Sequence, residues 1–216
     1  MNLMKKMFAI AMLAVGALAF VQPAQAQEAP DALVKRISQE VLDAAKTDKD
    51  IQSGNQKKVI SLVEEKVLPH VDFQRMTALA AGRFWREASP DQQKQLTDEF
   101  RTLLVYTYSG AISQVRDQKL DFKPMRADAS DTEVEVRSQV LQPRGGDPIQ
   151  LNYRLEKLPS GNWKIYDVNV LGAWLVETYK GNFAAEISKG GVDGLIKTLA
   201  EKNKRLAANA GKTGKS

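Results

Sequence analysis

Apolar residues recur every three or four positions through the first part of the chain, the spacing of a helix with one buried face. Between residues 31 and 46 six positions follow this period: Leu33, Val34, Ile37, Val41, Leu42 and Ala45. A second helical run ends at Pro69, and Asp72 is placed to cap a third. The pattern predicts one full helix followed by two short ones.

A longer helix is predicted from Ser89, where Pro90 and Gln92 supply a first-turn proline and a capping-box partner. Its apolar stripe extends toward Arg116. The stripe consists of Leu96, Phe100, Leu103, Leu104, Thr107 and Ala111. The uncharged part of this helix is too short and too rich in hydroxyls for a membrane span, so we expect a buried core helix.

The hydrophobic period then changes to two, which is typical of strands with one wet face. Residues 134–140 and 149–155 alternate in this way around a turn at residues 144–147. A further strand begins at Trp163, and residues 120–123 are candidates for a fourth. The sequence therefore predicts an antiparallel sheet whose strands follow one another in order.

The strand from Trp163 does not keep its apolar residues on one face. Trp163 and Ile165 fall on one side, and the next apolar residues fall on the other: Tyr166, Val168 and Val170. Either a one-residue bulge or burial of both faces would explain this. After Gly172 the helical period returns, pauses at residues 190–191 and continues to Leu199. Helices, then strands, then helices predict an α+β fold.

The first 26 residues have the pattern of an export signal. Lys5 and Lys6 precede an apolar run over residues 7–21, and the segment Ala24-Gln25-Ala26 then supplies the two small residues of a signal-peptidase site. That run is too short to span a membrane. We expect cleavage after Ala26, release into the periplasm, one domain over residues 27–201, and a basic, flexible tail over residues 202–216.

The formal net charge of +5 is concentrated at the two ends of the chain. Lys5 and Lys6 belong to the export signal, and residues 202–216 contain five basic residues and no acidic one. The remaining body has a net charge of about −2, so the composition does not indicate a nucleic-acid partner.

Catalytic groups are scarce. The chain has no cysteine and a single histidine, His70, which argues against zinc sites and histidine-based triads. His70 precedes a helix start, where a structural role is expected. Asp167, beside Tyr166 on an apolar strand, could act as a base if burial raised its pKa, or it could pair with a neighbouring arginine.

Two arginines flank two aromatic residues in the segment GRFWRE. Arg83 and Arg86 could bind a phosphate while Phe84 and Trp85 cover an apolar entrance. They could equally be solvated side chains at a helix end whose aromatic residues belong to the core. The sequence leaves both interpretations open.

Three segments together are similar to one known family. They are VLPHVDFQRMTALAAGRFWREASPDQQKQLTDEFRTLLVYTYSGAI, YRLEKLPSGNWKIYDVNVLGAWLVETYKGNF and GGVDGLIKTL. In order and spacing the chain resembles the MlaC family of periplasmic phospholipid carriers from about Leu33 to Leu199. One departure is Leu171 and Trp174, where family members often have an acidic and a small residue.

The resemblance implies an NTF2-like curved antiparallel sheet of about four strands, with helices over its concave face enclosing the acyl chains of a phospholipid. It also implies which side chains bind lipid: Met76, Leu79, Phe84, Trp85, Phe100, Leu103, Leu104, Thr107, Tyr153, Tyr166, Val168, Val170, Trp174, Leu175, Tyr179 and Phe183. Arg83 and Arg86 become candidate head-group contacts. Phospholipid is then the cargo, and no metal or cofactor is expected.

The implied partners are an outer-membrane lipoprotein complex and an inner-membrane complex of MCE-domain and ABC-transporter subunits, served by a monomeric carrier. Two other hypotheses remain. The chain could be an NTF2-like isomerase or hydratase that uses Asp167 with Tyr166 or Tyr153. It could also be a periplasmic chaperone or adaptor that binds an apolar polypeptide segment.

Overall fold

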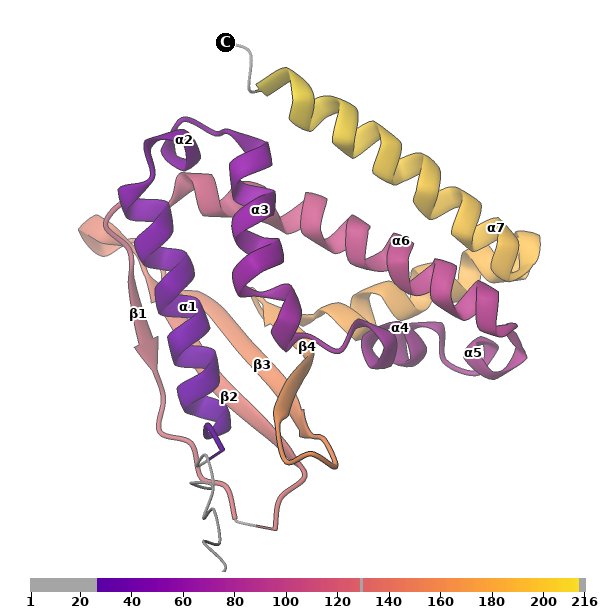
Figure 1. Cartoon of the computed structure of the whole chain (residues 1–216), viewed down its shortest axis with the longest axis horizontal. Coiled ribbons are helices and arrows are strands. Elements are labelled where there is room, and N and C mark those ends of the chain that lie inside the picture. Colours follow the sequence, from indigo (N-terminus) through magenta and orange to yellow (C-terminus); the bar gives the residue numbers. More distant parts are fainter. Residues whose placement is uncertain (1–26, 129, 214–216) are drawn as a thin grey trace, which may run out of the picture.

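The computed structural model describes residues 27–128 and 130–213. The predicted export signal and its cleavage site lie outside these residues. In Figure 1, α1 crosses the face of the sheet, while α4, α6 and α7 gather beyond β4. The helices thus form two groups, one over the strands and one beside them.

The first half of the chain is helical, as its period predicts. Asp72 caps α4 by accepting a hydrogen bond from the Arg75 backbone N–H at 2.8 Å, which confirms the predicted cap. The early elements are α1 (Pro30–Thr47), α2 (Lys49–Gln52), α3 (Gln56–Lys66), the 3₁₀ turn η1 (Leu68–His70), α4 (Phe73–Ala81) and α5 (Phe84–Glu87).

The predicted capping box at the start of α6 (Pro90–Tyr108) is confirmed. The Gln92 N–H donates to Ser89 Oγ at 3.2 Å, and the Ser89 N–H donates to Gln92 Oε1 at 3.0 Å. The α-helix ends at Tyr108 and continues as the 3₁₀ helix η2 (Ser109–Gln114), short of the expected end at Arg116. Ser109 and Gly110 are poor helix formers, which accounts for the earlier end.

The sheet has five strands in sequential order, each antiparallel to the next. The α+β, NTF2-like fold class is therefore confirmed, with one strand more than expected. The strands are β1 (Lys119–Phe122), β2 (Glu133–Leu141), β3 (Ile149–Lys157), β4 (Trp163–Val170) and β5 (Ala173–Trp174), with the 3₁₀ turn η3 (Pro143–Gly145) between β2 and β3.

The additional strand β5 depends on the two residues before it. Leu171 and Gly172 have φ values of 54° and 89°, as a two-residue type I′ hairpin turn requires. Leucine rarely adopts this left-handed conformation, so the sequence pattern does not predict the turn. The turn folds two residues back onto β4, and it leaves the Leu171 side chain 70% exposed.

The last helix, α7 (Leu175–Thr213), is broken at Gly191, where φ is 67° and ψ is −173°. The helix break predicted near this point is confirmed. Its second half returns along α6 (Figure 1) and continues beyond Lys202, the expected start of the tail, because Asn203 Nδ2 donates to the Glu99 carbonyl at 2.9 Å. No helix in the described ranges is both long and apolar enough to cross a membrane.

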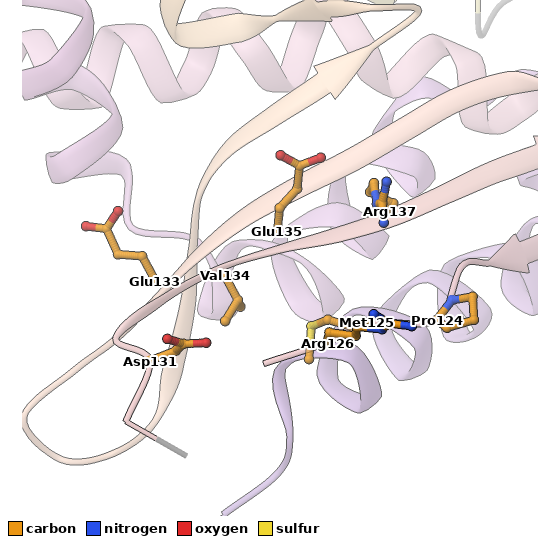
Figure 2. Close-up of a pocket in the computed structure, with 8 residues that line it drawn as sticks. All are labelled: Pro124, Met125, Arg126, Asp131, Glu133, Val134, Glu135 and Arg137. Atoms are coloured by element: carbon orange, nitrogen blue, oxygen red, sulfur yellow. The ribbon is translucent and has the colours of Figure 1, made fainter. Parts of the chain in front are cut away.

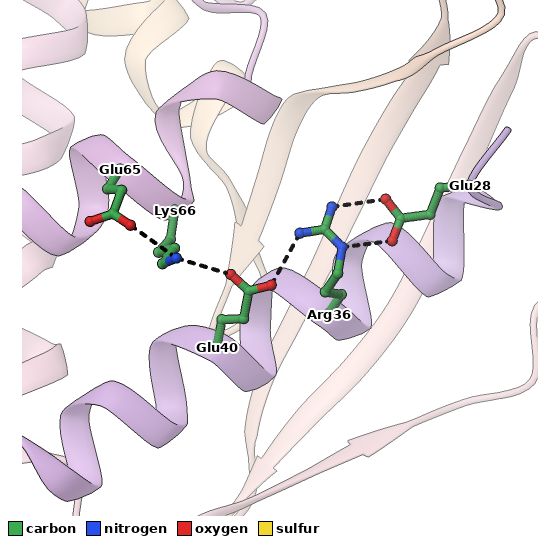
Figure 3. A network of polar contacts seen from close by, with 5 residues as sticks. All are labelled: Glu28, Arg36, Glu40, Glu65 and Lys66. Carbon is green, nitrogen blue, oxygen red and sulfur yellow. Dashed lines mark hydrogen bonds and ion pairs between the residues drawn. The ribbon is translucent and has the colours of Figure 1, made fainter. Parts of the chain in front are cut away.

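A chain of ion pairs joins Glu28, two positions before α1, to α1 and then to α3 (Figure 3). Arg36 binds Glu28 at 2.8 Å and Glu40 at 3.2 Å, and Lys66 then contacts Glu40 at 3.7 Å and Glu65 at 3.0 Å. All five side chains are well exposed, so solvent screens these pairs. The network helps to orient α1 against α3 and contributes little to the core.

Candidate functional site

The apolar core is divided, whereas a domain of this size usually has one contiguous cluster with small satellites. The helical cluster consists of Met76, Ala80, Ala81, Leu96, Phe100, Leu103, Leu104, Leu175, Val176, Tyr179, Phe183, Ile187, Leu195 and Leu199. The sheet cluster consists of Leu33, Val34, Ile37, Val136, Tyr153, Leu155 and Ile165. A small third group contains Ala45, Ile51 and Val59.

Half-buried side chains join the two large clusters. Val71 and Val168 pack against both of them, while Val170 packs against the helical cluster and Leu151 against the sheet cluster. In the ladder, Val168 pairs with Tyr153 and Val170 pairs with Leu151. We call the surface formed by Val71, Val168, Val170 and Leu151 the seam. It is apolar and incompletely covered by protein.

A bulge in β4 determines which of its side chains face the seam. Asp167 pairs with Arg154 and Ile165 pairs with Leu155, so Tyr166 is the extra residue on β4. The one-residue bulge proposed from the sequence is therefore confirmed. It places Ile165 and Val168, three positions apart, on the same face of the sheet.

Asp167 faces away from the seam and fixes the start of α7. Its side chain is 1% exposed, and Oδ1 accepts hydrogen bonds from the backbone N–H of Val168 at 2.9 Å and of Val176 at 3.0 Å. Burial raises the pKa of Asp167, and these two hydrogen bonds oppose that shift. The carboxylate thus acts as the N-terminal cap of α7.

Arg154 lies beside the Asp167 carboxylate. Its Nη1 lies 3.6 Å from Asp167 Oδ2, which confirms the alternative in which Asp167 pairs with an arginine. The same guanidinium lies 3.8 Å from the centre of the Trp174 ring. Trp174 is therefore held against Arg154, on the face of the sheet opposite the seam.

Three aromatic side chains fill the middle of the helical cluster. The Phe100 ring centre lies 4.9 Å from those of both Tyr179 and Phe183, and the last two are 5.9 Å apart. Burial, with Tyr108 beside it, raises the pKa of Tyr179 to about 12, so this phenol is neutral at physiological pH. The aromatic group forms a rigid, uncharged wall.

Most of the side chains predicted to bind lipid come together in or against these clusters. The helical cluster contains Met76, Phe100, Leu103, Leu104, Leu175, Tyr179 and Phe183. Partly buried against it are Phe84, Trp85, Val168 and Val170. Tyr153 lies in the sheet cluster, on the strand opposite Val168.

Four predicted contacts lie elsewhere. Leu79 is 40% exposed on α4, and Thr107 is exposed near the end of α6. Trp174 lies against Arg154, as described above. Tyr166 donates a hydrogen bond to Glu133 Oε2 at 3.1 Å, and the Arg75 guanidinium lies 3.8 Å from the centre of its ring.

Arg75 links helix α4 to the sheet. Its Nη2 lies 2.5 Å from Glu133 Oε1, and its Nη1 bonds Glu156 Oε2. The Arg75 guanidinium lowers the pKa of Glu133, with burial opposing this shift. We call Arg75, Glu133, Glu156 and Tyr166 the clasp. Tyr166 belongs to the clasp. The seam residues of β4, Val168 and Val170, lie on the opposite face of the sheet.

The candidate head-group contacts, Arg83 and Arg86, are exposed at α5, and the Arg83 guanidinium lies 4.8 Å from the centre of the Phe84 ring. Their assignment stays a prediction. His70 is half-buried, and burial lowers its pKa, so its imidazole is neutral at pH 7. Within residues 27–128 and 130–213, no cluster of three or more histidines and carboxylates could hold a metal ion.

Sequence reasoning missed Val71, Leu151 and Arg75. Val71 lies in a short link outside any periodic segment and reaches the seam through a parallel bridge to Ile165. Leu151 alternates with Tyr153, so the strand register would have revealed it. Arg75 is one of many surface-type arginines in the sequence, and only the fold brings it to Glu133.

Comparison with known proteins gives consistent matches. A family model for the MlaC protein matches residues 35–201. The intermembrane phospholipid transport system binding protein MlaC of Haemophilus influenzae is 22% identical over 204 residues, covering 93% of this chain and 95% of that protein. The toluene tolerance protein ttg2D of Pseudomonas putida is 25% identical over 176 residues, covering 81% and 80%.

A solved structure agrees with this result. The phospholipid-binding protein from Ralstonia solanacearum, in complex with a phospholipid, is 49% identical to this chain, with a TM-score of 0.77. The match covers 84% of this chain and 99% of that protein. Since the family model covers all but the two ends of the chain, the chain belongs to the MlaC family.

Proposed function

We propose that this protein binds phospholipid in the periplasm and carries it between the outer and inner membranes, and so helps to maintain the lipid asymmetry of the outer membrane. The observation that carries the proposal is the divided core, in which two apolar clusters meet at the half-buried Val71 and Val168. The phospholipid complex of the 49% identical relative supports it. The acyl chains would lie along the seam, between the sheet and α6 and α7.

Free lipid crosses water slowly because exposing its chains is costly. Two acyl chains contain roughly 30 methylene groups, and at about 0.8 kcal/mol each their exposure costs on the order of 20 kcal/mol. A carrier has to shield them throughout the transfer. Loading therefore requires docking to a membrane complex: an outer-membrane lipoprotein complex on one side and an inner-membrane MCE-domain and ABC-transporter complex on the other.

No chemical step is needed for this function. We propose no cofactor, no metal and no catalytic residue, and a monomer as the active form. The carboxylate favoured by the enzyme hypothesis, Asp167, already accepts two backbone hydrogen bonds and pairs with Arg154. No observation favours an isomerase or hydratase over a carrier.

Native mass spectrometry of the protein as purified tests the proposal. A carrier retains a bound mass that organic extraction identifies as phospholipid. A co-purifying peptide would support the chaperone hypothesis instead. An empty protein that turns over a small substrate would support the enzyme. Either of these outcomes would overturn the proposal.

A further inference from the structure

One edge of the sheet is open along part of β2. Strand β1 pairs only with the far end of β2, from Lys119 opposite Leu141 to Phe122 opposite Ser138. The last contact of that ladder is the Lys123 N–H donating to the Arg137 carbonyl at 2.9 Å. Among the described residues, nothing pairs with the backbone of β2 on this side before Arg137.

The alternation of an antiparallel ladder shows which groups point outward. Since the Arg137 carbonyl points toward β1, the N–H and C=O groups of Glu135 and Glu133 point the same way. The Thr132 carbonyl confirms the alternation, because it accepts from the Lys157 N–H on the opposite side. The outward groups of Glu133 and Glu135 are therefore free to pair with another strand.

A surface pocket of about 720 Å³ lies beside this open edge (Figure 2). One side is the segment Pro124–Arg126, which leaves β1, and the other side is β2 itself. The lining is Pro124, Met125, Arg126, Asp131, Glu133, Val134, Glu135 and Arg137. With five charged residues of eight, the pocket does not suit acyl chains, and it is distinct from the seam.

The side chains along the edge have a regular pattern. Glu133, Glu135 and Arg137 lie on one face of β2, and Val134 and Val136 lie on the other. Glu133 binds Arg75, whereas neither Glu135 nor Arg137 forms an ion pair with a described side chain. Because Lys123 occupies the position beside Arg137, a strand added here would meet the two acidic positions, Glu133 and Glu135, on one face.

We propose that the open edge of β2 is a docking site for an extended segment of a partner protein. The segment adds as a sixth strand, through backbone hydrogen bonds to Glu133 and Glu135. Its basic side chains face these two carboxylates, and an apolar side chain faces Val134 between them. This site is separate from lipid binding and does not depend on it.

Docking there would reach the clasp as well. Glu133 holds Arg75 of α4, and α4 supplies Met76 to the helical cluster. A basic side chain placed against Glu133 competes with Arg75 for the same carboxylate. A partner bound at this edge would thus contact the carboxylate that holds α4 against the sheet.

Amide hydrogen exchange measured by NMR tests the open edge in the free protein. We expect Val134 and Val136 to be protected, because they bond β3, and Glu133 and Glu135 to exchange quickly. Protection of Glu133 and Glu135 in the dilute free protein would overturn the proposal. Protection that appears only as protein concentration rises would show that the occupant is a second copy of this chain, which would also overturn it.

A synthetic peptide serves as the probe. The sequence Lys-Val-Lys-Val, blocked at both ends, places lysines against Glu135 and Glu133 when it adds antiparallel, and it stops short of the position opposite Arg137 that Lys123 occupies. At millimolar concentration it should slow exchange at these two amides, and a scrambled peptide of the same composition should not. No change, or the same change with both peptides, would contradict the proposal.

Two variants at one position separate the backbone contribution from the charge. Glu135→Pro removes an outward N–H without breaking a bond to β3, and proline is tolerated on such an edge. We expect it to weaken peptide binding about tenfold, as loss of one hydrogen bond implies. Glu135→Gln keeps the N–H and should bind more tightly than the proline variant. Equal binding by the two variants would exclude strand addition, and bound lipid measured on the same samples should be unchanged.

Discussion

At the scale of single residues, the Asp167 carboxylate accepts a hydrogen bond at the start of α7, and we expect its role to be structural. Asp167→Asn keeps an oxygen that can accept from Val168 and Val176, so we expect normal folding and normal lipid content by mass spectrometry. Asp167→Ala removes the acceptor of the buried Val176 N–H and of the partly buried Val168 N–H, and it should lower the free energy of unfolding by about 1–3 kcal/mol. A folded asparagine variant without lipid would contradict a structural role.

The same residue predicts a dependence of stability on pH. Burial raises the pKa of folded Asp167 above its ordinary value of 3.8, so the folded protein holds this proton more tightly than the unfolded chain does. Its contribution to stability is therefore fully present below pH 3.8 and is lost as the pH rises through the folded-state pKa. The unfolding free energy of wild type relative to Asp167→Asn should fall over that range in urea titrations. A difference that grows with pH would contradict the assignment.

Val168 tests the position of the seam. Because it is half-buried between two clusters, Val168→Trp should fill space used by an acyl chain and retain the fold while carrying less phospholipid. Val136→Trp is the matched control, since Val136 is 1% exposed within the sheet cluster, and overpacking there costs about 1–3 kcal/mol. Thermal unfolding of delipidated samples and lipid content are measured together. A strongly destabilised Val168 variant, or a stable one with normal lipid content, would mean that the acyl chains do not lie against Val168.

Residue-level prediction from sequence succeeded where periodicity carries the information. The stripe through Phe100, Leu103 and Leu104 is buried as expected. Tyr166 shows the limit: alternation places it with Val168, but the bulge makes it the extra residue, and Arg75 and Glu133 then hold it. The bulge can be inferred from the apolar pattern of the strand. The partners of Tyr166 cannot, because Arg75 and Glu133 come from distant segments of the chain.

At the scale of elements, the break in α7 depends on one glycine. Gly191 has φ 67° and ψ −173°, a conformation almost restricted to glycine, so Gly191→Ala should lower the unfolding free energy by about 1–3 kcal/mol. The neighbouring Gly190→Ala is the control. A Cβ at Gly190 meets nothing within 4 Å, and its φ is not positive, so this change should be neutral or stabilising by up to about 1 kcal/mol. Equal effects in urea denaturation would show that the break is not rigid.

Element boundaries were predictable where a local signal exists. The capping box at Ser89 and the cap at Asp72 each depend on side chains within three residues, and both are confirmed. Strand β5 could not be predicted, since it follows a turn in which Leu171 adopts a left-handed conformation that leucine disfavours. The helix beyond Lys202 depends on Asn203 reaching Glu99, a contact more than a hundred positions apart in sequence.

At the scale of the whole molecule, bound lipid should stabilise the fold, because its acyl chains would fill the seam where the two clusters meet. A ligand that binds only the folded state at 100 times its Kd stabilises it by about 2.7 kcal/mol, so we expect removal of the lipid to lower the apparent stability by that amount. For a domain of this size that corresponds to a decrease of about 5–10 °C in Tm. Differential scanning calorimetry of loaded and delipidated protein measures this shift.

The Val168→Trp variant makes the comparison specific to the seam. If the tryptophan occupies the space of the acyl chains, the delipidated variant should unfold close to delipidated wild type, and adding phospholipid should raise its Tm much less. The control is Gly190→Ala, which changes none of the seam side chains. This variant should show the full lipid-induced increase in Tm. A full lipid-induced shift in the tryptophan variant would mean that lipid binds away from Val168, because a filled seam leaves no volume for the chains that the ligand must bury.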